Sequence, residues 1–103
     1  MAAQPTPIEP PGRGLLEGKR VVITAAAGTG IGGALARRCL LEGATIVVSD
    51  AHERRIGETA DALGEEFGER PPAVVCNVTD DADVRGLVST AMTTMGGIDV
   101  WMN

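Results

Sequence analysis

Four short, largely apolar stretches recur along the chain. They read VVIT, TIVVS, AVVC and IDVWM, and they occupy residues 21–24, 45–49, 73–76 and 98–102. Gly, Pro, Asn or Asp residues bound each stretch. Apolar runs without polar alternation are typical of strands that are buried on both faces. We therefore predict four buried strands.

Between these stretches the apolar residues follow helical spacing. This spacing predicts helices over residues 31–42, 53–67 and 81–95. Gly43 lies where a helix C-terminal cap is favoured, and Thr79 or Asp80 can cap the start of the third helix. Strands and helices thus alternate, which predicts an α/β fold with an open, Rossmann-like parallel sheet, helices on both faces, and a chain that ends after the fourth strand.

Composition limits the chain to one domain. Its 103 residues can bury one core. The chain begins with a Pro- and Gly-rich segment whose apolar residues follow neither strand nor helix spacing. We expect a flexible arm over residues 1–17, with Leu15 and Leu16 attaching its end to the body, and a partial nucleotide-binding domain over residues 18–103.

Charge and apolar content exclude several classes of partner. The net charge is −5 and the nine Lys and Arg residues are scattered, so neither a nucleic acid nor a membrane is expected as a partner. No stretch is long enough to span a membrane, and no signal peptide is recognisable. Cys39 and Cys76 fall in apolar segments without metal-ligand spacing and are interpreted as buried hydrophobes. We expect a soluble cytoplasmic protein without a metal site.

The loop after the first strand carries the candidate chemistry. It reads TAAAGTGIGG over residues 24–33, and Gly28, Gly30 and Gly33 form the pattern GxGxxG. Free amides and the positive end of the helix dipole favour a diphosphate at such a helix start. Gly28 and Gly30 are free to adopt positive φ, and Gly32 or Gly33 allows the helix to pack closely.

An acidic residue ends the second strand, as a dinucleotide site requires. Asp50 follows Gly30 by twenty residues, and its carboxylate can accept hydrogen bonds from both ribose hydroxyls while repelling a 2′-phosphate. Arg54 and Arg55 could instead receive that phosphate, but a solvated face of the second predicted helix is the preferred interpretation of both. We therefore expect NAD as the cofactor, with NADP as the alternative.

The chain resembles the short-chain dehydrogenase/reductase family over residues 18–103. The resemblance rests on VVITAAAGTGIGGALAR, VVSDAHERR, CNVTDDADV and GGIDVWMN. The family motif TGxxxGIG is matched by Thr24, Gly30, Ile31 and Gly32. Ala25 stands where the family has glycine, and the loop is one residue longer.

The resemblance implies roles for further residues. Asn77 would bond the adenine edge, the Val78 backbone would face the adenine ring, and Asn103 would begin the motif NNAG. The predicted cofactor-binding set is Thr24, Gly28, Thr29, Gly30, Ile31, Gly32, Asp50, Asn77, Val78 and Asn103.

The resemblance also places the family's catalytic Ser, Tyr and Lys beyond the last residue. The chain has no Tyr, and its single Lys precedes the first strand. We therefore predict the coenzyme-binding half of an NAD(P)-dependent oxidoreductase, a fragment that is inactive alone and meets its small-molecule substrate only in a full-length form.

Two other functions remain open. One is a non-catalytic nucleotide-sensing module, and the other is a methyltransferase half that binds S-adenosylmethionine at a similar loop. The apolar fourth strand should leave a sheet edge open, which favours self-association. His52 is interpreted as a solvated side chain and Asp99 as a structural residue.

Overall fold

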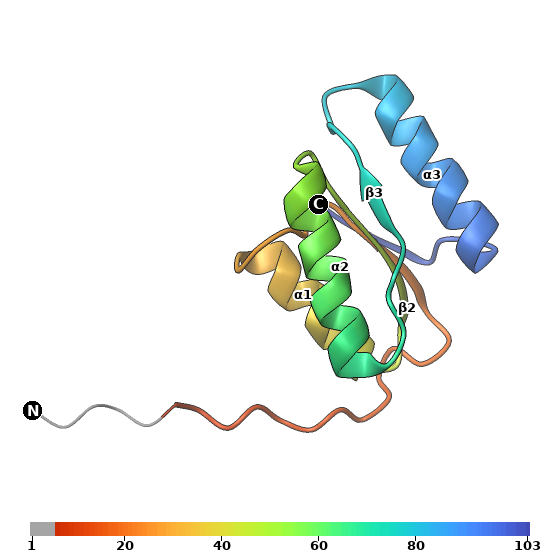
Figure 1. Cartoon of the computed structure of the whole chain (residues 1–103). Coiled ribbons are helices and arrows are strands. Elements are labelled where there is room, and N and C mark those ends of the chain that lie inside the picture. The colour runs from red at the N-terminus through yellow and green to blue at the C-terminus, as the bar shows by residue number, and fades with distance from the viewer. Residues whose placement is uncertain (1–5) are drawn as a thin grey trace, which may run out of the picture.

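The computed structural model describes residues 6–103, and it contains one parallel sheet of four strands (Figure 1). The strands are β1 (Arg20–Ile23), β2 (Thr45–Asp50), β3 (Ala73–Val75) and β4 (Val100–Met102), in the order β3-β2-β1-β4. Three helices connect them: α1 (Ile31–Leu41), α2 (Glu53–Phe67) and α3 (Asp81–Met95). The predicted fold class is therefore confirmed.

The strand β1 lies inside the sheet and supplies both cores. Val22 pairs with Val47 of β2 on one side and with Trp101 of β4 on the other. Val21 and Ile23 face one core while Val22 faces the other, and all three are fully buried. Burial on both faces explains why this strand has no polar alternation.

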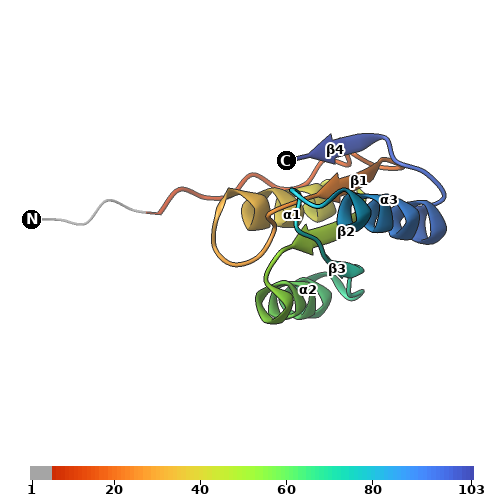
Figure 2. The same cartoon turned by 90° about the horizontal axis from the view of Figure 1, so that it is seen from above.

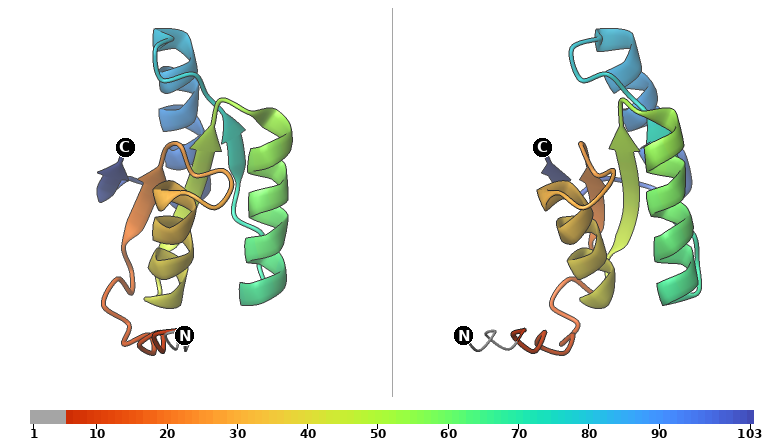
Figure 3. Two further views of the ribbon diagram at one scale, coloured as in Figure 1. Left: turned by 90° about the vertical axis from the view of Figure 1, so that its left-hand side faces the viewer. Right: turned by 60° about the vertical axis from the view of Figure 1, so that its left-hand side comes forward.

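The helices cover opposite faces of the sheet. Figure 2 shows α1 and α2 on one side and α3 on the other. On the α1 and α2 side, Cys39, Ala60 and Leu63 pack with alternate residues of β1 and β2. On the α3 side, Leu87 and Ala91 pack with the remaining ones. This two-sided arrangement (Figure 3) leaves the carboxyl ends of the strands at one edge of the molecule.

The helix ends follow local chemistry. Asp80 caps α3 by accepting hydrogen bonds from the amides of Ala82 and Asp83. Gly68 and Gly96 end α2 and α3 in the left-handed conformation that glycine favours. The predicted bounds of α2 and α3 are confirmed, and α1 ends one residue before the predicted position.

The fourth strand is shorter than predicted. It begins at Val100, whereas Asp99 lies before it and receives the amide hydrogen of Arg20 on its carboxylate (2.8 Å). That carboxylate also pairs with the Arg20 guanidinium, which lowers the pKa of Asp99 to about 2. The structural role expected for Asp99 is confirmed.

The segment before β1 lies against the C-terminal half of α1. Leu16 packs on the core beneath α1 and α2, whereas the Leu15 side chain is 70% exposed, so Leu16 alone forms the expected apolar attachment. Residues 1–5 of the expected arm lie outside the described residues. Among residues 6–103, no helix has the length and apolarity needed to cross a membrane.

Candidate functional site

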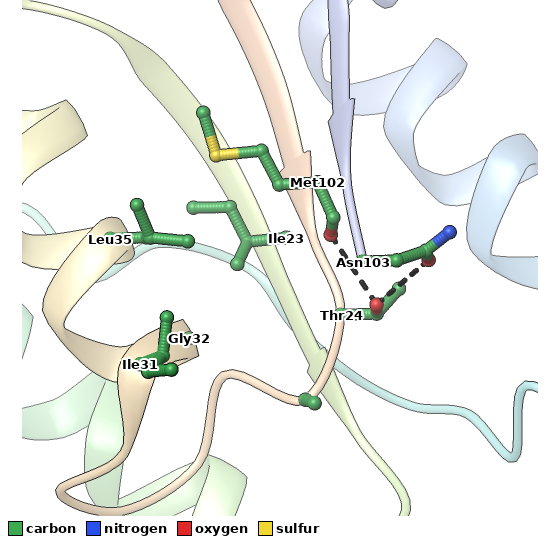
Figure 4. Close-up of a pocket in the computed structure, with 8 residues that line it drawn as sticks. Ile23, Thr24, Ile31, Gly32, Leu35, Met102 and Asn103 are labelled. Atoms are coloured by element: carbon green, nitrogen blue, oxygen red, sulfur yellow. Dashed lines mark hydrogen bonds between the residues drawn. The ribbon is translucent and has the colours of Figure 1, made fainter.

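The residues that follow β1 and β4 meet at the carboxyl edge of the sheet. The buried hydroxyl of Thr24 donates a hydrogen bond to Oδ1 of Asn103 (3.0 Å) and lies 3.3 Å from the carbonyl oxygen of Met102 (Figure 4). The indole of Trp101 donates to the same Oδ1 (2.9 Å). Two donors thus fix the Asn103 amide, whose nitrogen has no acceptor within residues 6–103.

The glycine loop takes a path that differs in one respect from the prediction. Gly28 has φ of +79°, as expected. Gly30 has φ of −79° with ψ of −170°, which is an extended conformation open to any residue. Ala25 instead adopts φ of +50°, at the position where the resembled family has glycine. The left-handed positions of the loop are therefore 25 and 28.

Gly32 and Gly33 are required by close packing. A Cβ atom on Gly32 would lie 2.1 Å from the carbonyl oxygen of Ala25, and one on Gly33 would lie 2.5 Å from that of Gly28. The close approach expected at these glycines is present, and it brings the first turn of α1 against the loop backbone itself.

The start of α1 differs from the starts of α2 and α3. Its N-cap is Gly30, which provides no side-chain hydrogen bond, and its first turn carries no acidic residue. In α2 the first turn holds Glu53 beneath the cap His52, and α3 begins with several aspartates. Among the described helices, α1 therefore presents the most uncompensated positive end, next to the carboxyl edge of the sheet.

Asp50 ends β2 at the same carboxyl edge of the sheet. Its Oδ2 accepts a hydrogen bond from the amide of His52 (2.9 Å), which shapes the turn into α2. The cap of α2 is His52, whose Nδ1 accepts from the amide of Arg55 (3.2 Å). The cap of α2 is thus His52 and not Asp50, and this capping role of His52 was not predicted from the sequence.

The residues that follow β3 lie at the same edge. Oδ1 of Asn77 accepts hydrogen bonds from the amide (3.0 Å) and the hydroxyl (2.6 Å) of Thr79, so the side chain is fixed within its own turn. The next side chain, Val78, is 58% exposed. A cavity of about 530 Å³ brings it together with residues of three other segments: Thr24, Ala25, Val84, Trp101 and Asn103.

A second cavity, of about 300 Å³, opens on the other side of Thr24 (Figure 4). The Ile31 side chain there is 82% exposed, and Leu35, Met102 and Ile23 complete an apolar wall. The predicted set did not contain Trp101, Leu35 and Met102. Their apolar side chains in a strand and a helix indicated only core packing, so the sequence did not show that they line a site.

The remaining candidates lie away from these cavities. Arg54 is exposed and pairs with Glu58 (3.0 Å) on α2. Cys39 and Cys76 are buried free thiols, as expected, and burial raises the pKa of both.

Comparisons with known proteins identify relatives of this chain. The sequence model of the family described as enoyl-(acyl carrier protein) reductase matches residues 25–103. A relative from Mycobacterium tuberculosis is 55% identical over 97 residues, which are 94% of this chain and 37% of the relative. That relative is named (5R,7aS)-5-hydroxy-7a-methyl-1-oxo-2,3,5,6,7,7a-hexahydro-1H-indene-carboxyl-CoA reductase.

Solved structures give the same result. A short chain dehydrogenase from Mycobacterium smegmatis superposes with a TM-score of 0.90 at 52% identity, covering 96% of this chain and 41% of that one. L-sorbose reductase from Gluconobacter frateurii, complexed with NADPH, superposes with a TM-score of 0.77 at 35% identity, and the match covers 84% of this chain and 32% of that one. A 3-ketoacyl-(acyl-carrier-protein) reductase from Brucella melitensis, complexed with NADH, superposes with a TM-score of 0.70 at 32% identity, and the match covers 84% of this chain and 33% of that one. This chain thus spans well under half the length of each.

Proposed function

The chain belongs to the short-chain dehydrogenase/reductase family, and from this premise we propose that residues 18–103 bind the adenosine diphosphate portion of a nicotinamide dinucleotide. The observation that carries the proposal is the start of α1. It has no side-chain cap and no acidic residue in its first turn, although the other two helices have both.

The glycines fit a diphosphate at this helix start. A Cβ atom added to Gly28 or Gly30 would have no heavy atom within 4 Å, so the outer side of the loop is open to a ligand. In our proposal the amides of residues 29–32 donate to the diphosphate oxygens, because no side chain covers them and the helix dipole favours an anion there.

The flanking residues take the rest of the nucleotide in this proposal. Asp50 accepts hydrogen bonds from the adenosine ribose hydroxyls through the carboxylate oxygen that does not bind the His52 amide. Asn77 offers its amide nitrogen to the adenine edge while its oxygen holds the turn, and Val78 lies against the ring. Thr24, Ile31 and Asn103 line the cavities that lead toward β4.

We propose NAD as the preferred dinucleotide. A 2′-phosphate would meet the Asp50 carboxylate, and the guanidinium of Arg54 is engaged by Glu58. Neighbours in the family are complexed with NADH and with NADPH, so family membership alone does not select between the two.

For the whole protein we propose hydride transfer between the nicotinamide ring and a carbonyl or alcohol substrate. The nicotinamide supplies or accepts the hydride when bound. The Mycobacterium tuberculosis relative is a reductase, which supports this reaction class. In this scheme residues 18–103 bind and orient the cofactor, and no proton donor for the substrate is assigned among them.

We also propose self-association through β4. This strand pairs with β1 along one edge, and its other edge has no partner strand within residues 6–103. Trp101 and Met102 are only half buried. An open apolar edge of this kind favours pairing with a second copy.

Dinucleotide titration tests the proposed function. Trp101 is the single tryptophan and lines a site cavity, so its fluorescence should report binding of NAD, NADP or S-adenosylmethionine. We expect NAD to bind most tightly. Asp50→Asn should weaken NAD binding about tenfold and reduce the preference over NADP, whereas Glu65→Gln, the same charge change on an exposed part of α2, should have no effect. A folded chain that binds neither dinucleotide would refute the proposal.

A further inference from the structure

A hydrogen bond joins the glycine loop to α2. The amide of Gly28, at the tip of the loop, donates to the hydroxyl oxygen of Thr59 (3.0 Å), which lies 31 residues later. Thr59 is half buried on α2, next to the fully buried Ala60. Loops are generally more mobile than the elements that they connect. The contact therefore joins the glycine loop to a helix that is packed into the core.

The tip of the loop has few other supports. Ala26 is tied to β2 through its amide, which donates to the carbonyl oxygen of Ser49 (2.9 Å). Within residues 27–30, all of which the structure describes, Gly28 is the one residue whose amide donates to an acceptor outside the loop. Loss of that bond would leave the tip without a polar anchor.

Gly28 is held from two sides. Its amide donates to Thr59, and its carbonyl oxygen lies so close to α1 that a Cβ on Gly33 would approach it to 2.5 Å. Its φ of +79° turns the chain between these contacts. A cavity lined by Gly28, Gly33, Thr59 and Leu63 continues between α1 and α2 below the contact.

We infer that Thr59 is a positioning residue for dinucleotide binding, because its hydroxyl holds Gly28 in place and so aims the open amides of residues 29–32. The inference rests on the proposed function. A fixed loop binds more tightly than a mobile one, since less conformational entropy is lost when the ligand binds. Thr59 itself touches no part of the nucleotide in this scheme.

The role explains how this chain accommodates its longer loop. The extra residue between Thr24 and Gly30 adds conformational freedom, and a hydroxyl on α2 removes it at the position where the loop turns. Because α2 begins at Glu53, three residues after Asp50, the same contact couples the diphosphate loop to the helix that follows the ribose-binding carboxylate.

Three variants of the full 103-residue chain test the inference. Thr59→Val keeps the shape and removes the acceptor, Thr59→Ser restores the hydroxyl, and Thr90→Val makes the same change at a half-buried position of α3 whose hydroxyl has no partner within residues 6–103. Should Thr59→Val fail to fold, Thr59→Ala compared with Thr59→Ser gives the same contrast.

Two readouts separate positioning from stability. Without ligand, amide hydrogen exchange at Gly28 should be about tenfold faster in Thr59→Val, whereas exchange in the β1 core should be unchanged. Affinity for NAD should fall about five- to tenfold, as expected for one lost hydrogen bond, and Thr59→Ser should restore both values. Thr90→Val should change neither.

Each contrary result has its own meaning. Unchanged exchange at Gly28 in Thr59→Val would overturn the inference, because the loop would then be held by other contacts. Equal NAD affinities of the unsubstituted chain and Thr59→Val would overturn this inference alone. An unsubstituted chain that binds no dinucleotide would overturn the proposed function together with it.

Discussion

The carboxylate of Glu42 accepts a hydrogen bond from the backbone amide of Arg13 (2.7 Å), 29 residues earlier in the chain. The same oxygen accepts from the amide of Leu15 (3.3 Å), and the other binds the guanidinium of Arg38 (2.6 Å). Glu42 is only 4% exposed, at the end of α1. One buried carboxylate therefore holds the segment before β1 against this helix.

Removal of the Glu42 charge should release that segment. Glu42→Gln keeps the shape but can no longer offer two charged oxygens to three donors, so we expect faster proteolysis around residues 9–15 and a lower melting temperature. Limited proteolysis with mass spectrometry checks this. Glu65→Gln, on an exposed part of α2, should leave the cleavage rate unchanged.

Acid should have the same effect as the Glu42 substitution. The amides of Arg13 and Leu15 and the Arg38 guanidinium lower the pKa of Glu42 below its ordinary 4.5. A carboxyl group with a depressed pKa contributes stability that is complete above its unfolded value and is lost as the pH falls through its folded value. Cleavage of residues 9–15 should therefore rise in the unsubstituted chain as the pH falls below the ordinary pKa of 4.5. It should rise less in Glu42→Gln, where the Glu9 carboxylate that pairs with Arg37 can still be protonated.

The left-handed conformation of Ala25 offers a stabilising substitution. An L-residue with φ of +50° is strained by contact between its Cβ and the backbone, and glycine is not. We expect Ala25→Gly to raise the free energy of unfolding by about 0.5–1 kcal/mol, measured by urea denaturation. Ala27→Gly, in the same loop but without positive φ, should lower it.

Gly32 should tolerate no side chain. A Cβ there meets the Ala25 carbonyl oxygen at 2.1 Å, so Gly32→Ala should destabilise the fold by about 1–3 kcal/mol and abolish NAD binding. Gly86→Ala on α3 meets no atom within 4 Å and should instead stabilise by about 1 kcal/mol, because alanine favours the helix. Thermal melts with NAD titrations compare the two. Equal stability of both variants would contradict the packing argument.

The pair formed by Arg20 and Asp99 should give the chain a second acid-sensitive contact. The pKa of Asp99 is depressed from 3.8 to about 2 by hydrogen bonds from Arg20. Its contribution to stability is complete above pH 3.8 and is lost as the pH falls through about 2. Urea midpoints measured between these pH values should therefore fall less steeply in Asp99→Asn than in the unsubstituted chain.

The sequence was sufficient for the elements whose ends are set locally. The helices at 53–67 and 81–95 have their predicted bounds because Gly68, Asp80 and Gly96 act on neighbouring residues. The fourth strand was predicted too long, because the Arg20 amide that engages Asp99 comes from a segment 79 residues away. Apolar spacing carries no information on such a partner.

Some features of the candidate site could be predicted from the sequence and others could not. The glycine pattern located the loop, and parallel topology brings Thr24, Val78 and Asn103 to one cavity. Three consecutive alanines gave no hint that Ala25 takes the left-handed conformation. The contact between Gly28 and Thr59 joins two segments with no shared periodicity, so it could be found only from the three-dimensional arrangement.

The position of β1 between two cores restricts where insertions and deletions can arise in related genes. Adding or removing one residue within Arg20–Ile23 would exchange the faces of Val21, Val22 and Ile23 and disrupt both cores at once. Length variation is better tolerated after Thr24, where the backbone has left the sheet. The lineage of this chain could thus acquire an additional loop residue without rebuilding its interior.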